Sequence, residues 1–304
     1  MATESELIAA LSEIFTVGDS NLLVGIGDDA AVIKANSSNL VAATDMAVEG
    51  VHFNRDWSNL HEIGAKITAA NLADIFAMGA TPKYLLVSAG LTKDFGIEEI
   101  KELAIGIKSE ADLVGALVVG GDISKADQLV ISISVFGEVG SPIKRSGALV
   151  GDLVVVSELP GKSAAGLAEL KRGGKQSKFI QAHKKPDVNY KLAAKFIGVN
   201  SMCDVSDGLL SELNHISKAS AVAIEIDSAL ISKLPGFAEL EVTAESASED
   251  IWNWVLGGGE DHVFLATTSS EIPSGAFVIG KVHAGSGVSV SGISKLPAIG
   301  FRHF

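Results

Sequence analysis

The amino-acid sequence predicts a protein of two domains, each with a mixed α/β or α+β fold. The chain of 304 residues is long enough for two sizeable cores. Short apolar runs typical of strands alternate with segments of helical spacing in both halves. A segment rich in Gly, Ser and Pro, from Gly140 to Asp152, separates the halves. We therefore predict domains at 1–140 and 141–304.

Turn residues and apolar spacing define the elements of the first half in chain order. The sequence "TESE" at Thr3–Glu6 matches a capping box and predicts a helix that ends near Phe15. The turn segment "KANSSN" separates two apolar runs that we interpret as strands. We then expect a helix from Asn59 that stops at Gly79, a strand at 83–91, a helix at 96–115 and strands at 116–122 and 128–139.

The second half repeats this alternation of strands and helices. A helix that includes "ESASEDIWNWVL" is expected to stop at the glycines that follow it. The complete set of expected elements is a strand at 153–159, helices from Gly161 and from about Asp187, a strand that enters a helix within 201–220, a strand at 221–226, a helix at 245–256 and strands at 262–268 and 276–282.

The charge balance limits the classes of partner that we expect. With 37 acidic and 24 basic residues, the net charge is −13, and no basic block offsets repulsion from nucleic acid or an anionic membrane. No apolar run approaches the roughly 18 residues that span a bilayer. The acidic, amphipathic N-terminus differs from a signal peptide, and the single cysteine fits a reducing compartment, so we expect a cytoplasmic protein. We interpret Cys203 as a buried filler rather than a nucleophile.

Two glycine-rich segments match phosphate-binding motifs only in part. "GIGDDA" has the spacing of a dinucleotide fingerprint, with Asp45 20 residues after Gly25, but a second strand follows where a helix is required. "LPGKSAAG" contains Lys162 and Ser163, but Val156 stands where a Walker loop needs its first glycine. We therefore reject a dinucleotide site and interpret the second segment as an ordinary helix start.

Acidic residues at the ends of apolar runs predict a divalent-cation site. Taken singly, most of them are better explained as turn formers or helix caps. Asp74 is harder to explain in this way, because a carboxylate inside "AANLADIFAMGA" is costly to bury without a partner. Lys and Arg are sparse nearby and no Cys/His pair has zinc spacing, so the oxygen-rich set favours Mg²⁺. The acids are Asp28, Asp29, Asp45, Asp74, Asp122, Asp204, Asp207, Glu260 and Asp261.

Eight segments, in order, resemble the thiamine-monophosphate kinases, of the superfamily that includes aminoimidazole ribonucleotide synthetase. They span 25–304 and read "GIGDDAAV", "TDMAVEGVHF", "NLADIFAMGATP", "GGD", "RSGALVGD", "DVSDGLLSEL", "GGGED" and "GFRHF". The resemblance implies a two-domain aminoimidazole ribonucleotide synthetase-like fold, with the N-terminal domain sheet pairing across a homodimer. It also implies an enzyme that moves the γ-phosphoryl group of ATP to thiamine monophosphate by direct, in-line, Mg-assisted transfer, giving thiamine diphosphate and ADP.

The resemblance also implies roles for individual residues. The N-terminal domain would bind ATP and Mg²⁺ and form the dimer, and His52 and Glu260 would bind thiamine monophosphate. Asp28 would orient its neighbour. From the residues alone, a half-buried histidine is the default interpretation of His52, and Glu260 fits a plain turn acid. Arg145 is equally well explained as a solvated linker residue. The resemblance assigns catalysis to Asp29, Asp74, Asp122 and Asp207, ATP binding to Gly121, Asp122, Arg145 and Ser206, and several Mg²⁺ ions to Asp29, Thr44, Asp45, Asp74, Asp122, Asp204 and Asp207.

Four positions depart from the family pattern. Ala43 replaces a hydroxyl residue, His262 and Val263 replace an aromatic and an acid, and Ala298 stands near an expected tryptophan. These departures affect the substrate face more than the metal face. Two alternatives remain open. One is another ATP-using member of the superfamily, such as a purine-pathway synthetase, with a different acceptor; the other is a non-enzymatic divalent-cation-binding protein, although no EF-hand spacing supports it.

Overall fold

The structure is a computed structural model that describes residues 10–11, 13–15, 20–24, 32–33, 38–269, 271–294 and 296–297. The chain divides into two compact units. Unit 1 contains Met1–Ile75 and Ala80–Gly140, and unit 2 contains Phe76–Gly79 and Ser141–Phe304. The predicted capping box at Thr3–Glu6 lies outside the described residues, whereas residues 10–11 and 13–15 are helical.

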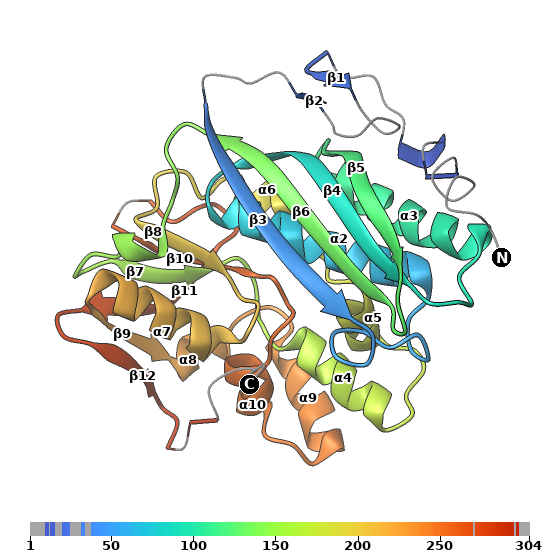
Figure 1. Ribbon diagram of the computed structural model, residues 1–304. Helices are drawn as coiled ribbons and strands as arrows, with labels where there is room; N and C mark the ends of the chain where they lie inside the picture. Colours follow the sequence, from blue (N-terminus) through green and yellow to red (C-terminus); the bar gives the residue numbers. More distant parts are fainter. Residues whose placement is uncertain are drawn as a thin grey trace. The chain divides into compact units, whose positions relative to one another are not determined.

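Unit 1 is built on a mixed β-sheet, which we call the unit 1 sheet (Figure 1). Among the described residues, its strands lie in the order β3 (Asn39–Val48), β6 (Val130–Val139), β4 (Thr81–Leu91) and β5 (Leu117–Lys125). β4 and β5 are parallel, and the other neighbours are antiparallel. β3 and β5 therefore form opposite edges. The short strands β1 (Leu22–Val24) and β2 (Val32–Ile33) pair with each other.

The two faces of the unit 1 sheet differ because side chains alternate along each strand. In β6, Ile131 and Ile133 are fully buried, whereas Ser132 between them is only half-buried. Met46 of β3 lies opposite Ser132 and therefore shares its face. Met46 is 60% exposed, and Leu40, on the same face of β3, is 69% exposed. One face of this sheet is thus packed, and the other presents apolar side chains.

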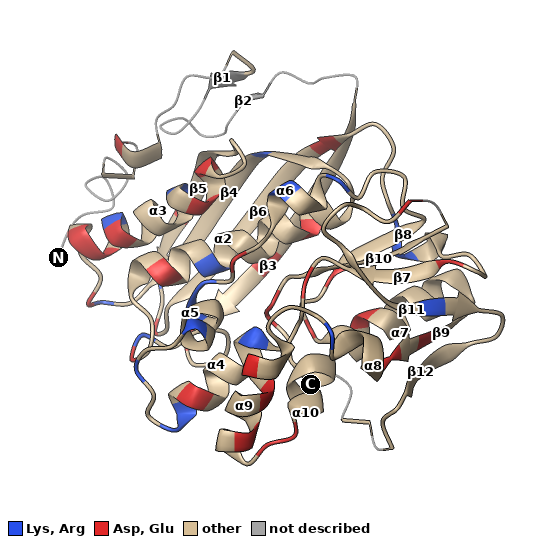
Figure 2. Cartoon of the chain, turned by 180° about the vertical axis from the view of Figure 1, so that it is seen from behind, with Lys and Arg blue, Asp and Glu red and all other residues tan. Residues whose placement is uncertain are grey.

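Helices α2 (Leu60–Ala77) and α3 (Ile97–Asp112) cover the packed face of the unit 1 sheet. A Cβ added to Gly137 of β6 would lie 2.6 Å from Cγ2 of Ile75, which places α2 directly against this face. Both helices lie behind the strands in Figure 1 and in front of them in Figure 2, which shows the opposite side.

Two glycines allow α2 and α3 to approach each other closely. A Cβ on Gly64 of α2 would overlap the carbonyl oxygen of Leu103 and lie 2.9 Å from the backbone nitrogen of Ile107. A Cβ on Gly106 of α3 would overlap the carbonyl oxygen of His61. Glycine is disfavoured by about 1 kcal/mol in helix interiors, so this close packing explains its presence.

Unit 2 contains a second mixed sheet, the unit 2 sheet. β12 and β9 are parallel, and the other neighbours are antiparallel. Val154 of β7 and Leu265 of β10 are fully buried, as expected for central strands. Among the described residues, the strand order is β12 (Gly287–Ser291), β9 (Ala223–Asp227), β11 (Phe277–His283), β7 (Leu153–Val156), β10 (Phe264–Thr268) and β8 (Ser201–Asp204).

The helices of unit 2 surround this sheet's apolar core. Helix α7 (Leu209–Ser220) buries Leu209, Leu213 and Ile216, a spacing that places them on one helix face. A 3₁₀ turn occupies Arg145–Gly147. The other helices are α4 (Lys162–Lys171), α5 (Lys178–Lys184), α6 (Tyr190–Ala193), α8 (Ser228–Ile231), α9 (Phe237–Ala247) and α10 (Ile251–Gly257).

Most of the predicted elements are confirmed, including the helix that begins at Lys162 after a strand. The single helix predicted at 245–256 is wrong. Its sequence belongs to α9 and α10, which are separated because Ser248 adopts a left-handed φ of 55° and Asp250 caps α10 by accepting the backbone N–H of Trp252. The helix expected from Asp187 is only the single turn of α6, and α5, α8 and β12 were not predicted.

No helix in the part of the chain that the structure describes is long and apolar enough to cross a membrane.

We expect Gly106→Ala to destabilise the protein by about 2 kcal/mol, because the new methyl group must force α2 and α3 apart. Helix propensity alone predicts the opposite sign, a gain of about 1 kcal/mol. The matched control is Gly140→Ala, where a Cβ would meet no atom within 4 Å. Urea denaturation measures both variants, and an unchanged or higher midpoint for Gly106→Ala would contradict the close packing.

Candidate functional site

The acids that the sequence analysis singled out are distributed over both units. Asp28 and Asp29 lie outside the described residues. Unit 1 contains Thr44, Asp45, His52, Asp74, Gly121 and Asp122, and unit 2 contains Arg145, Asp204, Ser206, Asp207 and Glu260. The two sets are described separately below.

Strand β3 and helix α2 bring Asp45 close to the helix face that carries Asp74. The backbone N–H of Asp45 donates to Oδ1 of Asn71 at 3.0 Å, and Asn71 is fully buried in α2. Asp74 lies three residues beyond Asn71, and side chains at this spacing share one side of a helix. Asp45 is exposed and Asp74 half-buried, so a carboxylate on the strand and one on the helix neighbour each other near the protein surface.

The side chain of Thr44 points to the face of the unit 1 sheet that exposes Leu40 and Met46, which we call the open face. Its Oγ1 donates to the carbonyl oxygen of Ile133 at 3.1 Å and accepts from Oγ of Ser134 at 3.0 Å. Because adjacent residues of a strand point to opposite faces, the side chains of Thr44 and Asp45 diverge. Ala43, which stands in place of the expected hydroxyl residue, supplies no side-chain oxygen.

A tight turn after β3 determines the orientation of His52. The backbone N–H groups of Val51 and His52 both donate to the carbonyl oxygen of Val48, at 3.1 and 3.0 Å. The backbone N–H of Val48 in turn donates to Nδ1 of His52 at 3.1 Å. A nitrogen that accepts this bond carries no proton, so Nε2 holds the hydrogen of the neutral ring. His52 is half-buried.

Asp122 and Asp45 lie at opposite edges of the unit 1 sheet. Asp122 belongs to β5 and Asp45 to β3, and three strand spacings of about 4.8 Å each give a separation of about 14 Å. Asp122 aligns with Ser88, which aligns with Ser132, so Asp122 lies on the open face. Asp45 aligns with Ile133 on the packed face. Within a single chain, these two carboxylates are therefore too far apart to bind the same metal ion.

Gly121 is required by the packing of the unit 1 sheet. A Cβ at this position would overlap the carbonyl oxygen of Val87 in β4. Asp122 follows it and accepts a hydrogen bond from Oγ of Ser124 at 3.3 Å. Among the residues that the structure describes, no group of three or more His, Cys, Asp and Glu side chains is arranged to hold a metal ion.

In unit 2, the segment after β8 and the segment before β10 are joined by backbone hydrogen bonds. The N–H of Val205 donates to the carbonyl oxygen of Val263 at 2.8 Å. The N–H of His262 donates to the carbonyl oxygen of Val205 at 3.1 Å. The N–H of Glu260 donates to the carbonyl oxygen of Ser206 at 2.7 Å. These bonds bring Asp204, Ser206, Asp207 and Glu260 to one edge of the unit 2 sheet.

The helix-cap explanation of Asp207 is not supported, because the N-cap of α7 is Gly208 and no side chain caps the helix. The half-buried Asp207 lies just outside the helix, beside the residues that the backbone bonds bring together.

Asp204 forms a buried pair with His262. Nδ1 of His262 lies 2.9 Å from Oδ2 of Asp204, and their side chains are 8% and 2% exposed. The family pattern predicts an aromatic residue at position 262, and it assigns no role to a histidine there. A sequence signal existed, since a carboxylate at the end of a buried strand needs a partner and no Lys or Arg stands near it.

Glu260 has two neighbours that the sequence analysis missed. Nδ1 of His183 lies 3.5 Å from Oε2 of Glu260 and 3.0 Å from Oγ of Ser163. His183 and Ser163 are buried, whereas the side chain of Glu260 is 35% exposed. This contact holds one carboxylate oxygen of Glu260 against the protein. His183 is 77 residues from Glu260 in sequence (260 − 183), and no local pattern indicated that they meet.

Asp261 connects this segment to the first turn of α4. Its Oδ2 accepts the N–H of Gly161 at 2.6 Å, and its Oδ1 accepts the N–H of Ser163 at 2.8 Å. Asp261 is buried, and burial raises its pKa to about 6 in spite of these two bonds. The residues on either side, Glu260 and His262, adopt left-handed φ angles of 63° and 52°. Such strain persists only where surrounding contacts hold it.

Arg145 pairs with a buried carboxylate. Nη2 of Arg145 lies 3.4 Å from Oε2 of Glu212, which also lies 3.1 Å from Nδ1 of His215. The side chain of Glu212 is 1% exposed, whereas that of Arg145 is 49% exposed. Burial raises the pKa of Glu212. Burial also raises the pKa of the Cys203 thiol, which is consistent with its interpretation as a filler.

Comparison with known proteins agrees with the fold described above. Residues 27–139 match the family model for the AIR synthase related protein, N-terminal domain, and residues 150–293 match the C-terminal domain. The chain is 37% identical to the thiamine-monophosphate kinase of Mycobacterium tuberculosis, over 93% of this chain and 88% of that protein. It is 35% identical to the thiamine-monophosphate kinase of Aquifex aeolicus, over 92% of both chains.

The fold is also similar to a solved structure described as AaThiL complexed with AMPPCP and TMP. The TM-score is 0.82 at 32% sequence identity, and the match covers 100% of this chain and 99% of that chain.

We expect Asp261→Asn to change the pH dependence of stability. The pKa of Asp261 is raised from 3.8 to about 6 on folding, so its contribution to stability is fully present below pH 3.8 and is lost as pH rises through about 6. The wild type should therefore lose up to about 3 kcal/mol relative to the variant between pH 4 and pH 7.

The measurement for this prediction is the urea midpoint of both proteins at each pH. The control is Asp187→Asn, which makes the same chemical change at an exposed position. A constant difference between wild type and Asp261→Asn would contradict the prediction.

Proposed function

The chain belongs to the thiamine-monophosphate kinase family of AIR synthase related proteins, and from this membership we propose that it transfers the γ-phosphoryl group of ATP to thiamine monophosphate. The observation that carries the proposal is the full-length similarity to a structure holding AMPPCP, an analogue of ATP, together with TMP. The products are thiamine diphosphate and ADP.

The residues suit a reaction that needs positioning more than proton transfer. The acceptor is already an anionic phosphate oxygen, so no general base is required. The barrier is the repulsion between two polyanions that must be brought into line. Arg145, which buried Glu212 holds in place, offers a guanidinium fork to a phosphate of ATP. His52, which the turn after β3 orients, and Glu260 bind thiamine monophosphate.

We propose that several Mg²⁺ ions take part. The candidate ligands are hard oxygen donors, as this ion prefers. The position of Asp45 beside the helix face that carries Asp74 supports such a site, because the two carboxylates supply hard oxygen donors from neighbouring elements. When bound, Mg²⁺ supplies charge neutralisation and alignment of the phosphates. The proposed ligands are Asp29, Thr44, Asp45, Asp74, Asp122, Asp204 and Asp207.

A homodimer accounts for two features of unit 1. The open face of the unit 1 sheet exposes Leu40 and Met46, which a second copy would cover. Asp45 and Asp122 lie at opposite edges of that sheet, so a second copy is needed to place one beside the other. We therefore assign ATP and Mg²⁺ binding and dimerisation to residues 1–140. The cytoplasm is the compartment that fits the free, buried Cys203.

Purified protein with Mg²⁺ and ATP should convert thiamine monophosphate into thiamine diphosphate, with one ADP formed per product, as measured by chromatography. A purine-pathway ribonucleotide is the comparison acceptor. ADP production with the ribonucleotide alone would favour a purine-pathway synthetase. Absence of ATP turnover with any acceptor, together with Mg²⁺ binding, would favour the non-enzymatic cation-binding protein.

Asp74→Asn should lower kcat by more than about 100-fold, since even outer-shell changes at metal sites reduce activity or affinity by about 10–100-fold. The thermal unfolding midpoint should change little, because the amide has nearly the same shape. Glu98→Gln, at an exposed position of α3, serves as the control and should remain active. Retention of most activity by Asp74→Asn would contradict the metal site proposed in unit 1.

Met46→Asp should convert the dimer into monomers, because it places a charge on the open apolar face without disturbing the packed one. Light scattering after size-exclusion chromatography measures the mass. The matched control is Ile105→Asp on α3, which is 50% exposed and lies away from this face. A monomeric wild type, or a variant that remains dimeric, would rule out this interface.

A further inference from the structure

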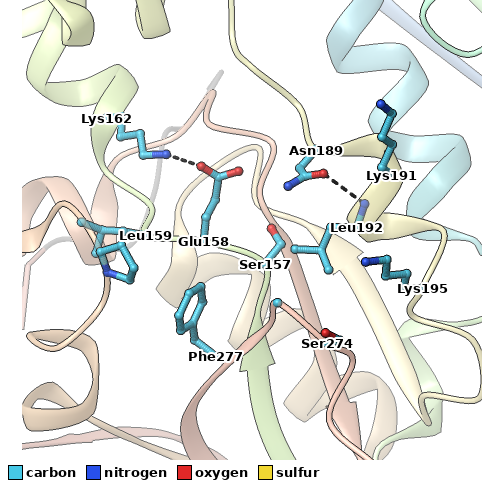
Figure 3. A pocket seen from close by; sticks show the side chains of 12 residues that line it. Ser157, Glu158, Leu159, Lys162, Asn189, Lys191, Leu192, Lys195, Ser274 and Phe277 are labelled. Atoms are coloured by element: carbon cyan, nitrogen blue, oxygen red, sulfur yellow. Dashed lines mark hydrogen bonds and ion pairs between the residues drawn. The ribbon is translucent and has the colours of Figure 1, made fainter.

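Unit 2 contains a pocket that has no part in the proposed reaction. It has a volume of about 400 Å³, within the range of small-molecule sites. Ser157, Glu158 and Lys162 line it from the connection between β7 and α4. Figure 3 shows Lys162 on one side of the pocket and Lys191 and Lys195 on the other, with Ser157 between them.

The charge of this pocket is opposite to that of the whole protein. The net charge of the chain is −13, but three lysines and a single acid, Glu158, line the pocket. Glu158 forms an ion pair with Lys162, which accounts for one lysine. Lys191 and Lys195 form no ion pair with any other described residue. The pocket therefore has two positive charges in excess, both on one wall.

The positions of Lys191 and Lys195 favour an anion beside them. Lys191 belongs to α6, and Lys195 follows in a continuing turn, where its backbone N–H donates to the carbonyl oxygen of Leu192 at 2.9 Å. Like charges four residues apart in helical structure repel by a few tenths of a kcal/mol. A bound anion would turn this repulsion into two attractive contacts.

Ser157 provides independent evidence for an acceptor in the pocket. Its residue is 3% exposed, and its Oγ accepts the backbone N–H of Phe264 at 2.9 Å. Its own hydroxyl hydrogen has no acceptor among the described residues. Buried donors are nearly always satisfied, so a ligand oxygen at this point would complete the group.

The rest of the lining is apolar. Leu159 is 1% and Leu192 6% exposed, and Phe277 presents its ring to the pocket (Figure 3). We propose that this pocket binds a small organic phosphate, whose phosphate group contacts Lys195, Lys191 and Ser157 and whose ring packs against Phe277 and Leu159. A phosphate monoester carries close to two negative charges at neutral pH and matches the two lysines.

This second phosphate site adjoins the candidate reaction site but is distinct from it. Phe264 of β10 connects them, because it aligns with Asp204 on one side and bonds to Ser157 on the other. The proposal does not rest on the kinase reaction, and its tests measure binding rather than turnover.

Pyridoxal 5′-phosphate is a suitable probe because it is an aromatic phosphate with an aldehyde. A lysine amine condenses with the aldehyde and releases water, and borohydride reduces the imine to a stable secondary amine. Peptide mass spectrometry should find labelling of Lys195 or Lys191 about tenfold above that of Lys218, an exposed control lysine on α7. Phenyl phosphate should protect the pocket lysines, and inorganic phosphate should protect them less well.

Calorimetric titration with phenyl phosphate tests the same contacts without covalent chemistry. The variant with both Lys191→Gln and Lys195→Gln should bind at least about tenfold more weakly than wild type, and Lys218→Gln should bind as wild type does. Equal labelling of the three lysines, or unchanged affinity of the double variant, would overturn the proposal. Protection by thiamine monophosphate but not by phenyl phosphate would overturn it as a second site and assign the pocket to the kinase substrate.

Discussion

The site in unit 2 depends on the backbone hydrogen bonds between residues 205–206 and 260–263. Glu260 and His262 have left-handed backbones, which cost about 1 kcal/mol or more for each non-glycine residue. Each backbone bond contributes about 1 kcal/mol, and the two bonds from α4 to Asp261 contribute more. The strained segment is therefore held in a single conformation. That conformation directs Glu260 towards His183 and His262 towards Asp204.

The buried acids of unit 2 are stabilised in three different ways. Asp204 contacts an imidazole, Glu212 contacts a guanidinium and an imidazole, and Asp261 accepts two backbone amides. Within the described part of the chain, none of these three acids forms an ion pair with a lysine. The lysines that border this region line the adjacent pocket instead, one strand away. Of these lysines, Lys162 acts on Asp261, where its positive charge lowers the pKa of the carboxyl group against the larger effect of burial.

Local patterns in the sequence predicted most of the fold. The alternation in β6 and the helical spacing of α7 were visible because burial on one face determines them. The break between α9 and α10 was not predicted, because it arises from the backbone of Ser248 inside a continuous helical pattern.

The candidate site was less accessible from the sequence than the fold. The family resemblance indicated Asp204, Ser206, Asp207 and Glu260, and the structure brings these four together. The roles of His183, Asp261 and His262 arise from contacts between distant segments, which no local periodicity encodes. The resemblance also could not reveal that Asp45 and Asp122 occupy opposite edges of one sheet.

That separation has a consequence for the proposed dimer. A reaction centre assembled from the β3 edge of one copy and the β5 edge of another does not exist in the isolated chain, however well that chain is folded. Activity would then disappear on dilution before any unfolding begins. In a mixed dimer, a subunit damaged only at Asp45 would still supply an intact β5 edge, so one subunit damaged at Asp45 and another damaged at Asp122 would form one complete site between them.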